Sequence, residues 1–199
     1  MAVMERGWPK FRAIALLATG LIIVHELRYV AAYGQNAGEA LAEQGHSYMP
    51  WAESLALVLL AISLVRFCAS LLKARSGEIP EERPPSFGRL WLGASSSLAA
   101  AYTLQEGFEG TFAPGHPSGL IGVFGHGGWS ALIFSLLVGA VIALLTRLAH
   151  HTIEMIARSA TRSQAGRSAR RLEPAFWAPP RRRLDVLALN LAGRAPPAS

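Results

Sequence analysis

The sequence predicts an all-α integral membrane protein, built around a bundle of four transmembrane helices. Hydrophobic residues make up 51% of the 199 residues and charged residues only 16%, which is too apolar for an ordinary soluble domain. The charged residues are also clustered between long apolar runs. This pattern indicates that lipid surrounds most of the chain.

Four segments are long enough to cross a bilayer, whose core of about 30 Å requires about 20 helical residues. Residues 1–150 therefore form the predicted transmembrane domain, and residues 151–199 form a basic, partly disordered cytoplasmic tail. The first segment also resembles a cleavable signal peptide, but the polar run from His25 to Arg28 favours a retained helix. The predicted spans cover about residues 11–33, 51–73, 87–110 and 127–150.

The distribution of basic residues predicts how the helices are oriented. Lysine and arginine precede the first span, flank the loop between the second and third spans, and fill the tail, but they are absent from residues 34–50 and 111–126. By the positive-inside rule, both termini are cytoplasmic and these two loops face outward. Only Lys10 and Lys73 are lysines, and this strong preference for arginine is typical of a GC-rich bacterial genome. The predicted location is therefore the bacterial plasma (inner) membrane.

The second half of the chain resembles the first at an offset of 80 residues, which predicts two tandem helical-hairpin repeats. The likeness is weak elsewhere, so chance similarity is the alternative interpretation. Residues 37–43 of the first outward loop are compatible with a short interfacial helix, and the glycine-rich residues 114–128 of the second are apolar enough to dip into the bundle. The matching positions are Glu26 with Glu106, Gly45 with Gly125, and His46 with His126.

Ionisable side chains near the outward ends of the first and third spans form the candidate site. Arg28 lies three residues after His25 and so shares a helix face with it, and Glu109 likewise follows Glu106. Charges at membrane depth are costly unless they pair. One hypothesis is therefore structural: Arg28 pairs with Glu106 or Glu109 and only fixes helix packing, as in a non-catalytic accessory or assembly subunit.

The second hypothesis is a metal site at the outward face. Imidazole and carboxylate ligands suit Zn, Cu(II), Fe or Mn, and the absence of nearby cysteine argues against a Cu(I) site. The protein would then bind or handle a small cation, either a transition metal or a proton. Haem is a variant of this hypothesis, although only His25 lies clearly within a span. The candidate ligands are Glu26, His46, Glu106 and His126, with His25, Glu109 and His116 as further members.

Other functional classes are less compatible with the sequence. The only aspartate is Asp185 in the tail, and neither a nucleophile elbow nor a Walker loop occurs, so the sequence favours a non-enzyme. The net charge of +6 resides largely in the tail, without the interleaved aromatic residues of single-strand binders, which argues against nucleic acid. Four helices are few for alternating access, so transport would require a homo-oligomer or a partner membrane protein.

Overall fold

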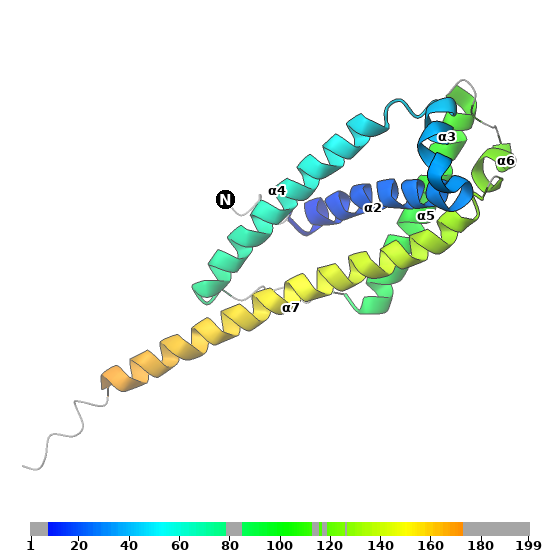
Figure 1. Ribbon diagram of the computed structural model, residues 1–199. Helices are drawn as coiled ribbons and strands as arrows, with labels where there is room; N and C mark the ends of the chain where they lie inside the picture. Colours follow the sequence, from blue (N-terminus) through cyan, green and yellow to red (C-terminus); the bar gives the residue numbers. More distant parts are fainter. Residues whose placement is uncertain (1–7, 79–84, 113–115, 117–118, 126, 173–199) are drawn as a thin grey trace, which may run out of the picture.

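The computed structural model describes residues 8–78, 85–112, 116, 119–125 and 127–172 (Figure 1). All regular secondary structure in these residues is helical, which confirms the all-α prediction. The elements are α2 (Trp8–Tyr33), the 3-10 turn η1 (Gly34–Asn36), α3 (Ala37–Glu43), α4 (Met49–Arg75), α5 (Phe87–Phe112), α6 (Gly119–Phe124) and α7 (Ser130–Leu172).

Among the described residues, three helical segments are long and apolar enough to cross a membrane: Lys10–Glu43, Met49–Arg75 and Ser130–Ala165. Large apolar side chains of α4, such as Leu57 and Val65, are more than half exposed, as expected where lipid covers a helix. These features indicate a membrane protein. Helix α5 is nearly as long as α4, but its serines and glutamates make it less apolar. A fourth span therefore stays a prediction.

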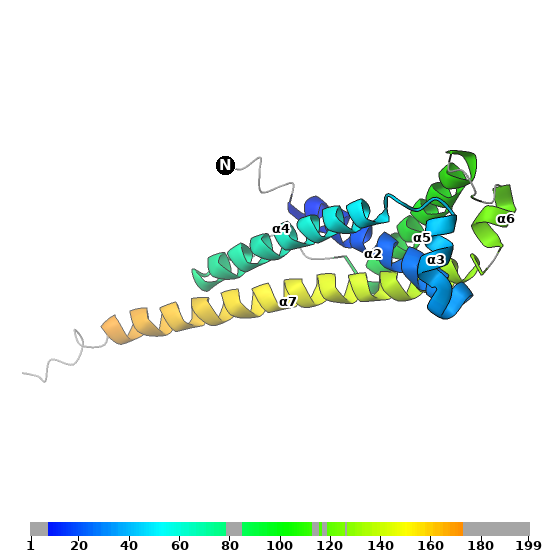
Figure 2. The ribbon, with the colours of Figure 1, turned by 45° about the horizontal axis from the view of Figure 1, so that its top comes forward.

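Helix α7 is the element against which the other long helices pack. Helices α5, α2 and α4 all contact it, and α2 also contacts both α4 and α5. The short helices α3 and α6 lie together at one end of the bundle, and α7 extends away from the other end (Figures 1 and 2). One buried apolar cluster consists of Val24, Leu98, Tyr102, Val123, Ala131 and Ile142, and a second, where α2 meets α3, consists of Tyr29, Ala37 and Ala40.

Small residues allow α5 and α7 to cross closely. A Cβ atom added to Gly139 of α7 would overlap the hydroxyl group and approach the backbone of Ser95 on α5. On α2, a Cβ atom added to Gly20 would lie 3.0 Å from Cδ1 of Ile142. Small residues at such crossings let helix backbones approach within lipid. Gly139 and Ser95 therefore serve packing within this chain.

Helix α7 continues well beyond residue 150, the predicted end of the last span, as the apolar residues Ile153, Ile156 and Ala157 suggested. It runs without a break to Leu172, because Ile153 and Ala157 pack against Ala74 at the end of α4. The predicted tail therefore begins as a helix, and residues 173–199 lie outside the described part of the chain.

The order of elements is similar in the two halves of the chain. A long helix, a short helix and a second long helix occur twice, and the short helix at Ala37–Glu43 is the one expected from the sequence. Gly45 and Gly127, both with φ of 82°, lie shortly before α4 and α7, a conformation that glycine adopts without strain. The packing is less symmetric, because α2 packs on α7 whereas α4 and α5 have no extensive contact.

Candidate functional site

A buried polar cluster lies at the end of the bundle that carries α3 and α6. Each long helix contributes residues from one face, because side chains three or four positions apart point the same way. The loops beside the two short helices add two histidines. The buried members are His25, Arg28 and Tyr29 of α2, Tyr102, Glu106 and Glu109 of α5, and the loop residues His46 and His116.

Arg28 and Glu106 join α2 to α5. Nη1 of Arg28 donates a hydrogen bond of 2.8 Å to Oε1 of Glu106, and both side chains are buried. Arg28 also donates to the carbonyl oxygen of Gly122 in α6 at 3.4 Å, and its guanidinium lies over the ring of Tyr29. This is the pairing that the structural hypothesis expects, because two opposite charges share one buried space.

Two histidines approach the same glutamate. Nε2 of His25 lies 3.6 Å from Oε1 of Glu106, and Nε2 of His116 lies 3.4 Å from Oε2. Neither ring nitrogen of His25 has a hydrogen-bond partner, although its side chain is fully buried. Buried polar atoms are nearly always paired, so such an exception calls for an explanation.

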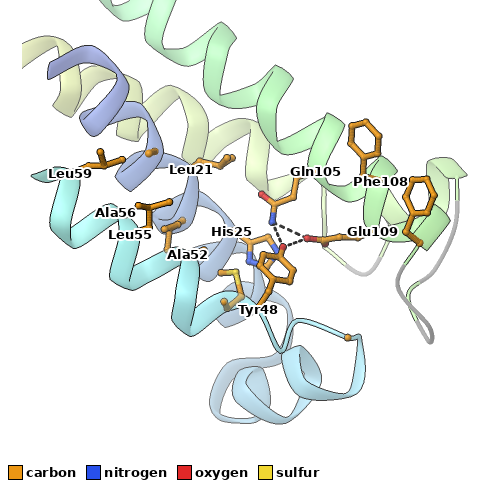
Figure 3. Close-up of a pocket in the computed structure, with 15 residues that line it drawn as sticks. Leu21, His25, Tyr48, Ala52, Leu55, Ala56, Leu59, Gln105, Phe108 and Glu109 are labelled. Atoms are coloured by element: carbon orange, nitrogen blue, oxygen red, sulfur yellow. Dashed lines mark hydrogen bonds between the residues drawn. The ribbon is translucent and has the colours of Figure 1, made fainter. Parts of the chain in front are cut away.

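Three polar side chains approach the carboxylate of Glu109. The Tyr48 hydroxyl donates to Oε1, as does Nε2 of Gln105 at 3.0 Å (Figure 3). Nε2 of His46 lies 2.9 Å from Oε2. Burial, together with the bond to Glu109, raises the pKa of Tyr48 above its ordinary value, so the phenol stays protonated and acts as a donor.

The backbone determines the tautomer of His46. Its Nδ1 lies 3.3 Å from the carbonyl oxygen of Leu41, and a carbonyl can only accept, so Nδ1 carries a hydrogen. The other nitrogen, Nε2, faces the carboxylate of Glu109. It must therefore carry a second proton, accept a hydrogen bond from a protonated Glu109, or offer its lone pair to a cation held between the two groups.

Four of these residues form a compact set of metal ligands. His25, His46, Glu106 and Glu109 each offer one ligand atom, and all four atoms lie within 4.8 Å of one another. Metal–ligand bonds of about 2.0–2.2 Å place the ligands of a tetrahedral ion roughly 3.4 Å apart. The set could therefore hold such an ion if its most widely separated ligand atoms, which lie up to 4.8 Å apart, moved closer by about 1.4 Å.

The structure brings together only part of the set that the sequence suggested. Glu26 is half-buried and is not in the four-residue group, because it lies about 100° around α2 from His25. Its role as a ligand stays a prediction, as does that of His126, which lies outside the described residues. His116 does approach the group. Sequence reasoning missed Tyr48, whose only signal was its position two residues after His46.

A groove adjoins the cluster. It has a volume of about 630 Å³ and lies between α4 and α5, with α2 beneath it. His25, Tyr48, Gln105 and Glu109 lie together at its polar end, and Leu55 and Leu59 belong to its apolar part (Figure 3). Thus one side of the candidate metal site is also the end of an apolar groove.

The chain was compared with protein-family models, curated proteins and solved structures, and none of them matches it. The geometry of the site is therefore the basis for assigning a function.

Proposed function

We propose that this chain is a four-span membrane protein that binds a transition-metal ion at His25, His46, Glu106 and Glu109. In this proposal α5 is the fourth span and both termini are cytoplasmic. The cluster then lies near the outward surface of a bacterial plasma membrane. The three candidate spans support the membrane setting, and the distribution of lysine and arginine supports the orientation.

The observation that carries the proposal is the environment of His46. The hydrogen bond from its Nδ1 to the Leu41 carbonyl leaves Nε2 turned toward Glu109. Metal-binding histidines commonly donate their second ring nitrogen to a backbone carbonyl, which orients the ring and fixes its tautomer. On the other side of the cluster, neither ring nitrogen of His25 has a hydrogen-bond partner, and Nε2 lies 3.6 Å from Glu106. This arrangement also supports a bound metal ion.

Charge also favours a bound cation. The cluster holds two carboxylates, but Arg28 lies against Glu106, and the described partners of Glu109 in ion-pair range are histidines. With neutral imidazoles the cluster would carry a net negative charge in a buried setting, which is unfavourable without a cation. A divalent ion would make the net charge of the cluster positive. His116, 3.6 Å from Glu109, is placed to act as a fifth ligand or to orient the carboxylates.

The ligand set restricts the ion. Nitrogen and oxygen donors without thiolate or thioether suit Zn, Mn, Fe or Cu(II) rather than Cu(I). Mixed histidine and glutamate ligation is compatible with Zn in a four-coordinate site. A higher coordination number, with His116 included, would favour Mn or Fe.

One contact supports a second candidate function. The buried pair between Arg28 and Glu106 is what an accessory or assembly subunit would use only to fix helix packing. That role explains the pair, but it leaves His25, His46 and Glu109 without a purpose. Proton handling would use the same residues, with a proton in place of the metal between His46 and Glu109.

The test is metal content and metal-dependent stability of the detergent-purified full chain. We expect near-stoichiometric metal by elemental analysis after growth with Zn, Mn and Fe. Metal at 100 times its Kd should stabilise the fold by about 2.7 kcal/mol. Both effects should disappear in His46→Ala and in Glu109→Gln.

The matched control is His151→Ala, which removes an exposed histidine of α7 far from the cluster. It should retain the metal. A folded wild-type chain that neither co-purifies with metal nor is stabilised by any of these ions would contradict the proposal. Retention of metal in both site variants would place the ion elsewhere.

A further inference from the structure

A buried arginine lies at the start of α2, far from the histidine cluster. Of the arginines that the structure describes, only Arg12 and Arg28 are buried. Arg28 is paired with Glu106. Arg12 is only 8% exposed, and within the described part of the chain it forms no hydrogen bond or ion pair. A buried charge is unfavourable unless an opposite charge or hydrogen bonds compensate it. The described residues therefore leave the charge of Arg12 uncompensated.

A second guanidinium lies beside the same turn of α2. The start of α2 runs along the second half of α4 (Figures 1 and 2), and the guanidinium of Arg66 lies 5.1 Å from the centre of the Phe11 ring. Arg66 is exposed, and the adjacent Val65 is more than half exposed. Two cations on neighbouring helices therefore lie at the same level of the bundle, beside a surface that lipid covers.

No carboxylate of the described residues lies in ion-pair range of Arg12. Toward this end of the bundle the described acidic residues are Glu78 and Glu154, and Glu154 pairs with Arg158 at 2.9 Å. The guanidinium nitrogens of Arg12 are not fully enclosed, unlike the ring nitrogens of His25. An anion from outside the chain can therefore reach Arg12.

We propose that Arg12 and Arg66 bind the phosphate group of an anionic phospholipid from the cytoplasmic leaflet. This site is separate from the proposed metal site and depends on the proposed function only for the orientation of the bundle, which puts the start of α2 on the cytoplasmic side. A guanidinium presents its N–H groups in a planar fork that matches two phosphate oxygens. Basic pockets between transmembrane helices on the cytoplasmic side bind such head groups.

The surroundings of the two arginines favour a lipid over a soluble ion. Arg66 lies within the apolar run of α4, before the terminal cations Lys73 and Arg75, so lipid rather than water surrounds it. Long arginine side chains reach from such positions toward the lipid phosphates. Ile14 of α2 and Val65 of α4 are more than half exposed and are placed to contact the acyl chains.

The charge of the site selects the head group. A zwitterionic head carries an ammonium group close to its phosphate, and a second guanidinium beside the phosphate would repel that ammonium group. An anionic head has no such cation. The two arginines should therefore prefer an anionic phospholipid to a zwitterionic one.

The probe is dioleoyl phosphatidylglycerol, with dioleoyl phosphatidylethanolamine as the matched zwitterionic lipid. The detergent-purified full chain is titrated with each lipid, and native mass spectrometry measures the bound fraction. Ammonium acetate at about 0.15 M screens the exposed cations of the tail and screens a buried group much less. We expect the anionic lipid to bind at least about tenfold more tightly, a ratio equivalent to about 1.4 kcal/mol.

Variants locate the bound lipid. Arg12→Gln and Arg66→Gln should each remove most of the preference for the anionic lipid. Arg158→Gln removes an exposed cation that pairs with Glu154 and, as the matched control, should retain it. Arg12→Gln should also leave the lipid-free chain at least as stable as the wild type, because no partner is lost. A purely structural role of Arg12 would instead lower that stability.

Equal binding of the two lipids, or a preference that Arg12→Gln leaves unchanged, would overturn the inference. Thermal stabilisation by inorganic phosphate or by oleate to the same extent as by phosphatidylglycerol would also overturn it, by assigning the site to a soluble ion or to a fatty acid. His46→Ala removes a proposed metal ligand at the opposite end of the bundle and should leave the lipid preference intact. The metal proposal and the lipid proposal can therefore fail separately.

Discussion

Arg28 and Glu106 form a buried ion pair that ties the first long helix to the third, with Nη1 and Oε1 separated by 2.8 Å. The contact occupies one oxygen of Glu106 and leaves the other, Oε2, 3.4 Å from His116. The carboxylate of Glu106 therefore links two helices through one oxygen and faces His116 with the other. The pair is a structural element of the site whichever cation the cluster holds.

Removing either partner of this pair should be far more harmful than removing both. Arg28→Met or Glu106→Leu alone leaves an uncompensated buried charge, and each should lower the free energy of unfolding by about 3–5 kcal/mol. The double variant should lose much less than the sum. Unfolding in mixed micelles by a denaturing detergent measures all four proteins of this cycle.

The exposed pair of Glu154 and Arg158, one turn apart on α7, is the control for that cycle. Its coupling energy should not exceed about 0.5 kcal/mol. Additive effects of the Arg28 and Glu106 substitutions would show that the two side chains do not act as a pair.

Tyr48→Phe should weaken metal binding without unfolding the chain. The substitution removes the hydroxyl that donates to Glu109, and loss of a group that orients a metal ligand typically costs 10–100-fold in affinity, so we expect about that loss here. Competition with a chromogenic chelator measures it. Tyr33→Phe, which removes a hydroxyl that accepts from Gln44, should leave the affinity unchanged. An unaltered Kd in Tyr48→Phe would exclude Glu109 as a ligand oriented in this way.

Gly139→Ala should destabilise the crossing of α5 and α7. The added methyl group would meet Ser95, including its backbone, and overpacking of this kind costs about 1–3 kcal/mol. Gly93→Ala on α5 is the matched control, because nothing lies within 4 Å of its added Cβ. Thermal unfolding of the detergent-solubilised variants compares them. Equal stability of the two variants would mean that α5 and α7 are not in close contact at Gly139.

Cysteine labelling tests whether α5 crosses the membrane. In a chain with Cys68→Ala, a cysteine at Ser86 should react with a membrane-impermeant maleimide only after the cells are opened. A cysteine at Thr111 should react from outside. Both positions are exposed and flank the apolar part of α5. Labelling of both from the same side would contradict a fourth span and the proposed orientation of the cluster.

Local sequence was sufficient to predict which ionisable residues share one face of a helix. His25 and Arg28 were expected on one side of the first helix, and both are buried there. Glu106 and Glu109 were expected on one side of the third helix, and both are buried as well. These expectations depend only on the helical period, which is the same in every α-helix. The short helix at Ala37–Glu43 was also indicated by local composition.

Positions that depend on distant parts of the chain were harder to foresee. The 80-residue offset made Glu26 the counterpart of Glu106 in a predicted ligand set, with His25 as a further candidate, and in the structure it is His25 that approaches Glu106. The rotation of α2 about its axis decides this, and contacts with α5 and α7 determine that rotation. The apolar residues Ile153 and Ala157 suggested that the last helix continues past residue 150, but their contact with Ala74 of α4 depends on how the chain packs.

Apolar run length and helical period are local properties, so the sequence alone was enough to predict a helical chain suited to a membrane. Which ionisable groups meet depends on the tertiary structure. It brought His46 and His116, from two separate loops, to the same pair of glutamates, and it left α4 and α5 apart to form a groove. Such contacts depend on how each helix is rotated and placed against its neighbours. Packing of the whole chain determines that arrangement.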